Sequence, residues 1–138
     1  MTDLLFVYGT LRKDMPTPAH RFLSAHSDFV AEGRIGGILY DTGHYPAAIV
    51  DGDARRSIVG DVFRLRAPAA GLPVLDEYEG CAAAGTSAAL FRRELVPVRL
   101  ANGASVAAWI YIYDRPVAGL VEIPSGDYRQ YCSSSESV

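Results

Sequence analysis

The chain is poor in the features that mark several classes of protein. It has only two cysteines in 138 residues, Cys81 and Cys132, and they form no cluster of the kind that binds a metal ion. No apolar run is long enough to span a bilayer, and no basic start followed by a long apolar stretch indicates a signal peptide. The composition therefore predicts a cytoplasmic protein with reduced cysteines, no metal and no membrane partner.

An excess of charge of one sign is also lacking. The formal net charge is −3, from 13 Lys and Arg against 16 Asp and Glu, and the pairs Arg55-Arg56 and Arg92-Arg93 form no patch. Nucleic acid is therefore not an expected partner, because its recognition needs clustered positive charge. With 49% hydrophobic residues, the chain is expected to form one domain over residues 1–131, followed by a disordered tail over 132–138.

What the sequence does contain is short apolar runs between glycine-rich turns. Asn102-Gly103 is the strongest hairpin signal, and on its second strand Tyr111 and Tyr113 share a face opposite Ile110 and Ile112. Helices are expected over 19–26 and 72–79, the second with Pro73 in its first turn, and strands over 4–8, 28–43, 47–50, 57–66, 90–100 and 104–113. These elements predict a small, highly curved sheet or barrel of the α+β class.

The first strand runs directly into a turn, Tyr8-Gly9-Thr10-Leu11. Glycine lets a backbone approach a ligand closely, and a concave array of backbone N–H groups binds anions and developing oxyanions. The turn is therefore a candidate binding loop, although an ordinary connection between two elements has the same pattern.

Glu79 is a candidate catalytic residue because of its position on the second helix. It follows Leu72 and Leu75 at helical spacing, so all three share the face that the leucines direct toward the core. A carboxylate there, at the unfavourable end of the helix dipole, is either a general acid/base in a pocket or pairs with Arg92 or Arg93, or frays into solvent.

Three tyrosines are candidates to line such a pocket: Tyr8, Tyr111 and Tyr113. The alternative is that they are ordinary half-buried aromatics. Two aspartates, Asp61 and Asp127, are expected to have structural roles within the sheet.

Six short segments, in register over residues 4–131, together resemble the gamma-glutamylcyclotransferase-like family in its small AIG2-like branch. The segments are Tyr8-Gly9-Thr10-Leu11-Arg12, Gly43-His44-Tyr45-Pro46-Ala47, Val59-Gly60-Asp61-Val62-Phe63, Leu75-Asp76-Glu77-Tyr78-Glu79-Gly80, Phe91-Arg92-Arg93-Glu94-Leu95-Val96 and Ile123-Pro124-Ser125-Gly126-Asp127-Tyr128. Phe91 departs from the tyrosine that is usual in the family. Residues 81–89 form an alanine-rich loop that lacks the polar groups that would identify a partner for the leaving group.

The resemblance implies a fold, an activity and a set of site residues. The fold is α+β, a small mixed, strongly curved β-barrel with two or three short flanking helices and a cavity at one end. The activity is release of 5-oxoproline from a small γ-glutamyl amine or amide, with no metal and no cofactor. Glu79 is the implied acid/base, and the expected substrate-binding residues are Tyr8, Gly9, Thr10, Leu11, Tyr45, Tyr111 and Tyr113.

Two other functions fit the same segments. One is a binding or regulatory protein that uses the cavity without turnover, since fold alone does not fix function. The other is an amide hydrolase in which water replaces the amine of the substrate as the nucleophile.

Overall fold

The computed structural model describes residues 2–9, 18–43, 46–50, 56–78, 91–113, 116–128 and 130–131. The predictions made for Thr10, Leu11, Tyr45, Glu79, the 81–89 loop and the 132–138 tail lie outside these residues. In chain order the elements are β1 (Leu4–Val7), α1 (Pro18–His26), β2 (Ser27–Asp41), β3 (Pro46–Val50), β4 (Ser57–Leu65), α2 (Pro68–Tyr78), β5 (Phe91–Leu100), β6 (Ser105–Tyr113) and β7 (Val121–Ile123).

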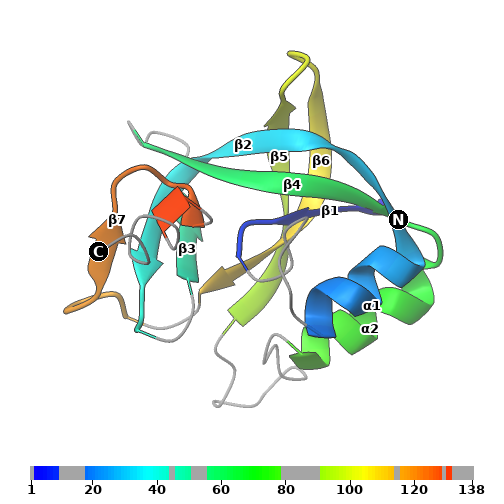
Figure 1. The fold of residues 1–138 in the computed structure, drawn as a ribbon, viewed down its shortest axis with the longest axis horizontal. Coiled ribbons are helices and arrows are strands. Elements are labelled where there is room, and N and C mark those ends of the chain that lie inside the picture. The colour runs from blue at the N-terminus through cyan, green and yellow to red at the C-terminus, as the bar shows by residue number, and fades with distance from the viewer. Residues whose placement is uncertain are drawn as a thin grey trace.

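The strands form a closed, mixed β-barrel (Figure 1). Neighbours pair in the order β3-β2-β4-β1-β6-β5, and an additional pairing of β2 with β5 closes the ring of β2, β4, β1, β6 and β5. β1 runs parallel to β6, with Leu5 opposite Trp109, while it is antiparallel to β4. The predicted α+β barrel is thus confirmed, and in the described part of the chain two helices accompany it.

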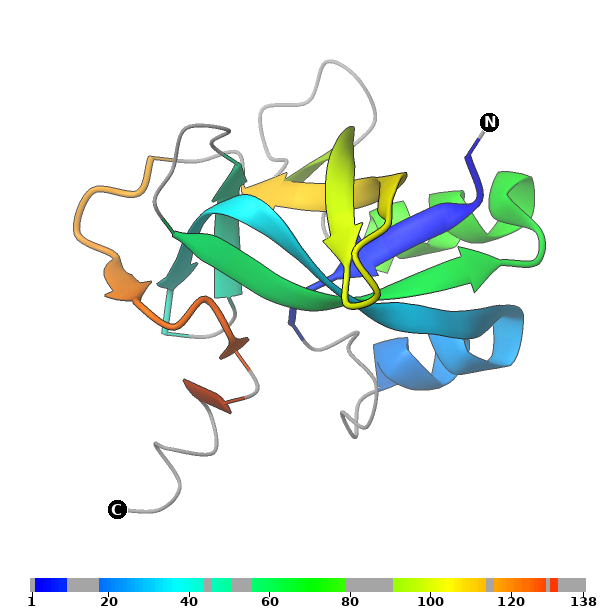
Figure 2. The same cartoon turned by 90° about the horizontal axis from the view of Figure 1, so that it is seen from above.

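β2 pairs with four other strands, β3, β4, β5 and β7. It extends over 15 residues, pairs with β4 along its first part, and pairs with β3 and β7 along its last part. Its register with β4 shifts between Phe29 and Ala31, a bulge of the kind that increases strand twist. The prediction of a strongly bent strand in this region is confirmed (Figure 2).

The β5–β6 hairpin forms at the predicted turn. Gly103 has a φ of 91°, which favours glycine, and Leu100 N–H donates to the carbonyl of Ala104 at 2.8 Å. The side-chain oxygen of Asn102 accepts a hydrogen bond from Ala104 N–H at 2.9 Å. Asn-Gly therefore supplies both the backbone conformation and the local hydrogen bond that the turn needs.

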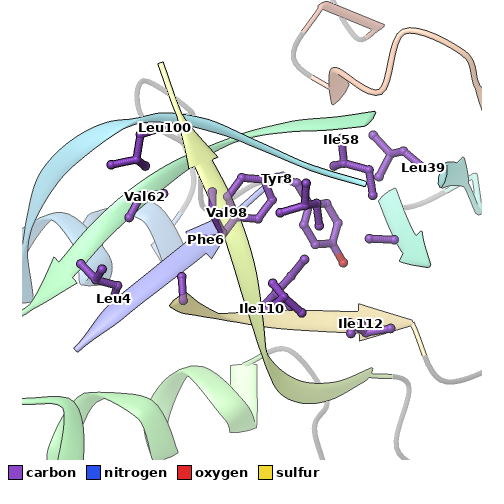
Figure 3. Packing of buried hydrophobic residues seen from close by; sticks show 14 of the residues in the cluster. Leu4, Phe6, Tyr8, Leu39, Ile58, Val62, Val98, Leu100, Ile110 and Ile112 are labelled. Carbon is purple, nitrogen blue, oxygen red and sulfur yellow. The ribbon is translucent and has the colours of Figure 1, made fainter. Parts of the chain in front are cut away.

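Two apolar clusters lie on the two sides of the barrel wall. The inner cluster fills the barrel and contains Leu4, Phe6, Tyr8, Ile35, Leu39, Ala48, Ile58, Val62, Val96, Val98, Leu100, Ala108, Ile110, Ile112 and Ile123 (Figure 3). The outer cluster lies between the barrel and the helices and contains Leu5, Val7, Leu23, Phe63, Leu65, Leu72, Leu75, Phe91 and Tyr111. The first strand contributes to both clusters, which explains why its apolar run is continuous.

Two elements differ from expectation. α2 begins at Pro68 and not at residue 72, so Pro73 lies inside the helix. Pro68 occupies a first-turn position, where its missing N–H costs little, whereas Pro73 leaves the carbonyl of Ala69 without its helical donor. β7 was not predicted, because three residues are too short a run to show a period.

Within the described residues, no helix is long and apolar enough to cross a membrane.

Candidate active site

The end of β1 is fixed to the end of β6 by Tyr8. The Tyr8 side chain is buried in the inner cluster, and its hydroxyl donates to the backbone carbonyl of Tyr111 at 2.6 Å. In Figure 3 the oxygen of Tyr8 is directed toward the strand that carries Ile110 and Ile112, which is β6. Because a carbonyl oxygen can only accept, the hydroxyl proton of Tyr8 is directed at β6.

Gly9 is in contact with the first residue of β3. A Cβ added at Gly9 would lie 2.6 Å from Cγ of Pro46 and 3.3 Å from Cδ, so the backbone passes against the pyrrolidine ring, and any side chain at this position would have to displace it. The structure therefore brings together described residues from two of the segments that carry the family resemblance, Tyr8-Gly9 after β1 and Pro46 at the start of β3.

The candidate tyrosines lie on two sides of the barrel wall. Tyr111 belongs to the outer cluster, and Tyr113 packs against that cluster with its ring edge-on to Phe91, at a centroid distance of 5.6 Å. Tyr8 belongs to the inner cluster. The structure thus groups Tyr111 with Tyr113 and separates both side chains from that of Tyr8. Their substrate-binding roles stay predictions.

The face of α2 that was predicted to be buried contributes to the outer cluster. Leu72 and Leu75 are 2% and 1% exposed and share the outer cluster with Leu5 and Val7. Burying a leucine contributes about 1.5–3 kcal/mol, so the cluster holds α2 against the barrel wall. Both views show β1 and α2 running in the same general direction, away from the N-terminal end (Figures 1 and 2).

The segments that follow these two elements are the ones predicted to form the site. Glu79 is the residue after Tyr78, where α2 ends. Arg92 pairs with Glu94 at 3.0 Å, and the Arg93 guanidinium lies 4.6 Å from the ring centroid of Trp109. A pairing of either arginine with Glu79 stays a prediction, because Glu79 lies outside the described residues.

Two carboxylates near this part of the barrel differ in environment. Asp61 is 2% exposed on β4, opposite Val7 in the β1–β4 ladder. Asp41 ends β2 and accepts hydrogen bonds from Gly43 N–H and from the Tyr131 hydroxyl. Sequence reasoning missed Asp41, although the spacing Asp41-Thr42-Gly43 is typical of a turn in which an aspartate accepts an N–H two residues further on.

The one carboxyl pKa that is clearly shifted among the described residues lies elsewhere. A hydrogen bond from Arg66 lowers the pKa of Asp28. Asp28 is opposite Arg64, which is itself opposite Leu4, so the pair sits at the start of β1 and not at the Tyr8-Gly9 end.

The fold defines a class of protein. An AIG2-like protein from Mus musculus superposes with a TM-score of 0.69 at 20% identity, covering 91% of this chain and 87% of that one. The sequence profile described as "Gamma-glutamyl cyclotransferase, AIG2-like" matches residues 5–130. The chain belongs to this family.

Two bacterial proteins illustrate the similarity. The "Gamma-glutamylcyclotransferase family protein YtfP" of Escherichia coli K12 is 32% identical over 126 residues, which cover 90% of this chain and 94% of that protein. The crystal structure of YkqA from Bacillus subtilis superposes with a TM-score of 0.74 at 27% identity over the whole of this chain. This chain spans only 44% of the length of YkqA.

Proposed function

We propose that this protein is an enzyme that releases 5-oxoproline from a small γ-glutamyl amine or amide. One observation carries the proposal: Leu72 and Leu75 of α2 belong to the same buried apolar cluster as Leu5 and Val7 of β1. Because Glu79 directly follows α2, and the Tyr8-Gly9 segment directly follows β1, this packing supports a site built from both.

The main requirement of this reaction is that the enzyme holds the substrate in a folded conformation, with its α-amine next to its γ-carbonyl. The α-amine of the glutamyl group attacks its own γ-carbonyl, closes a five-membered ring and releases the amine that was bound there. Because nucleophile and electrophile are already tethered, correct orientation alone can contribute about 7–11 kcal/mol of barrier reduction. In the proposal, the amides of Gly9, Thr10 and Leu11 hold the α-carboxylate and so fix the folded conformation.

Glu79 is proposed as the acid/base. The α-amine is protonated in water and first loses one proton to the solvent, which frees the lone pair that attacks the γ-carbonyl. As the new C–N bond forms, Glu79 removes a second proton from the ring nitrogen, and it then donates this proton to the departing nitrogen as the old C–N bond breaks. One carboxyl group suffices, since the two transfers are sequential. Such proton transfer contributes about 10²–10⁴-fold in rate.

The tetrahedral oxyanion is assigned to backbone N–H groups of residues 9–11 and not to Tyr8. The Tyr8 hydroxyl directs its proton at the Tyr111 carbonyl, so it cannot donate to an oxyanion without breaking a buried hydrogen bond. Loss of one oxyanion donor typically costs about 2.7–4 kcal/mol. Tyr111 and Tyr113 are proposed to contact the substrate from the helix side of the wall.

The experiment is a panel of γ-glutamyl amino acids and amines, γ-glutamyl-ε-lysine among them, assayed for 5-oxoproline with the wild type, Glu79→Gln and Glu77→Gln. We expect Glu79→Gln to fold and to lose at least about 10²-fold in rate. The matched control, Glu77→Gln on the same helix, should keep wild-type turnover. Undiminished turnover by Glu79→Gln would remove that residue from the mechanism.

An N-acylated γ-glutamyl substrate separates the proposed reaction from hydrolysis. Cyclisation needs a free α-amine, so the enzyme should leave this compound intact, whereas a hydrolase would cleave it. Binding of γ-glutamyl compounds without 5-oxoproline release by the wild type would instead support a non-catalytic binding protein.

A further inference from the structure

We propose that Asp41 and Tyr131 are positioning residues, through which the C-terminal segment holds the substrate-binding end of the barrel in place. The inference rests on the proposed function and deepens it. It extends the site from the Tyr8-Gly9 strand end to side chains that neither the family resemblance nor the mechanism above uses.

The carboxylate of Asp41 joins two parts of the chain at the end of β2. One oxygen, Oδ1, accepts a hydrogen bond from Gly43 N–H at 2.7 Å. The other, Oδ2, accepts one from the Tyr131 hydroxyl at 2.8 Å. Hydrogen bonds to an ionised group are roughly twice as strong as neutral ones, so this carboxylate fixes both the start of the turn and the position of Tyr131.

Asp41 is linked to Gly9 through Pro46. Gly43 has a φ of 98°, a conformation that favours glycine, and β3 begins at Pro46, which lies opposite Asp41 in the β2–β3 ladder. The Pro46 ring is the group against which Gly9 packs. Tyr45, a predicted substrate-binding residue, immediately precedes Pro46. A change at Asp41 is therefore expected to reach Gly9 through Pro46.

The segment that carries Tyr131 is held by backbone hydrogen bonds to the barrel, so Tyr131 has a defined position from which it can orient Asp41. β7 pairs with the end of β2, with Val121 opposite Asp41. Val59 N–H on β4 donates to the carbonyl of Gly126 at 2.8 Å, and Tyr131 N–H donates to the carbonyl of Asp127 at 3.0 Å. The C-terminal segment is thus attached to both β2 and β4 before it reaches Tyr131.

The experiment compares the full-length chain with three variants: Asp41→Ala, Tyr131→Phe and the double variant. Tyr40→Phe is the matched control, because it removes a hydroxyl from the neighbouring residue of β2. We expect the KM for a γ-glutamyl amine to rise about tenfold in Asp41→Ala and in Tyr131→Phe, the size of one lost hydrogen bond to a charged group. The kcat should stay within about twofold, since no group that touches the reacting atoms is removed.

A second readout does not depend on catalysis. In the unliganded protein, the amide NMR resonances of Gly43 and Gly9 should both shift in Asp41→Ala and in Tyr131→Phe, and should stay in place in Tyr40→Phe. The double variant should raise KM no further than Asp41→Ala, because Tyr131 acts through Asp41.

Gly9 resonances unchanged in Tyr131→Phe would overturn the inference, even if Asp41→Ala fails to fold. So would KM effects that add in the double variant. If the wild type releases no 5-oxoproline from any substrate, the proposed function fails, and the Gly9 and Gly43 resonances still decide whether these two residues position the site.

Discussion

Gly9 is the residue at which two candidate site segments meet. Gly9→Ala would place a methyl group 2.6 Å from Cγ of Pro46, so either the end of β1 or the start of β3 must move. We expect a loss of about 1–3 kcal/mol in the free energy of unfolding, together with a raised KM. Urea unfolding and steady-state kinetics measure the two effects.

A compensating substitution tests whether the contact with Pro46 is the cause. Pro46→Ala removes the ring, so the double variant Gly9→Ala/Pro46→Ala should recover part of the stability that Gly9→Ala loses. If the two losses simply add, the residues do not interact and the contact does not explain the need for glycine.

Single residues also show what the sequence can and cannot predict about the site. Alternation along the hairpin strand correctly separated Tyr111 and Tyr113 from Ile110 and Ile112. Nothing local predicts that Leu5 lies opposite Trp109, and this pairing puts the side chain of Tyr8 on the other side of the wall from Tyr111. The hydrogen bond between Tyr8 and Tyr111, 103 residues apart, is likewise a product of topology.

Among the elements, α1 and β2 are joined by an arginine. Arg66 donates to both carboxylate oxygens of Asp28, at 2.7 and 3.4 Å, and to the carbonyl of Ala25 at 3.0 Å. The hydrogen bond from Arg66 lowers the pKa of Asp28 below its ordinary value of 3.8. Because the pKa is lower in the folded state, the stabilisation is present above pH 3.8 and is lost as the pH falls through that lower pKa.

Arg66→Met should therefore return the pKa of Asp28 toward 3.8 and remove this part of the acid dependence of stability. An NMR titration of the Asp28 carboxyl carbon measures the pKa directly. Arg99→Met removes an equal charge from β5 and should leave that titration unchanged. A pKa for Asp28 in Arg66→Met as low as in the wild type would assign the shift to another group.

The elements were predictable where a local signal was complete. Asn102-Gly103 specified its hairpin, and the apolar positions of α2 specified its buried face. The start of α2 was misplaced because Pro73 resembles a first-turn proline, whereas Pro68 holds that position. Burial of Leu72 and Leu75 outweighs the hydrogen bond that Pro73 removes, a tertiary effect with no local sign.

For the whole molecule, closure of the barrel depends on β2 passing close to both of its neighbours. Gly33 pairs with Gly60 on β4 and with Leu100 on β5, so it lies where the ring closes. A Cβ at Gly33 would lie 2.7 Å from Cγ1 of Val98 and 3.3 Å from the backbone oxygen of Arg99. The contact at 2.7 Å is too close for a Cβ, and Val98 is a β-branched residue with few rotamers, so either Val98 changes its rotamer or β2 and β5 move apart.

We therefore expect Gly33→Ala to lower the free energy of unfolding by about 1–3 kcal/mol in urea and to expose the β2–β5 pairing to faster amide exchange at Arg34. Gly71→Ala is the matched control, because a Cβ there meets nothing within 4 Å and alanine should stabilise α2 by about 0.5–1 kcal/mol. Equal stability of Gly33→Ala and the wild type would mean that the β2–β5 pairing that closes the barrel accommodates a Cβ at residue 33 without strain. Slower exchange at Arg34 with lowered global stability would instead place the strain outside the β2–β5 junction.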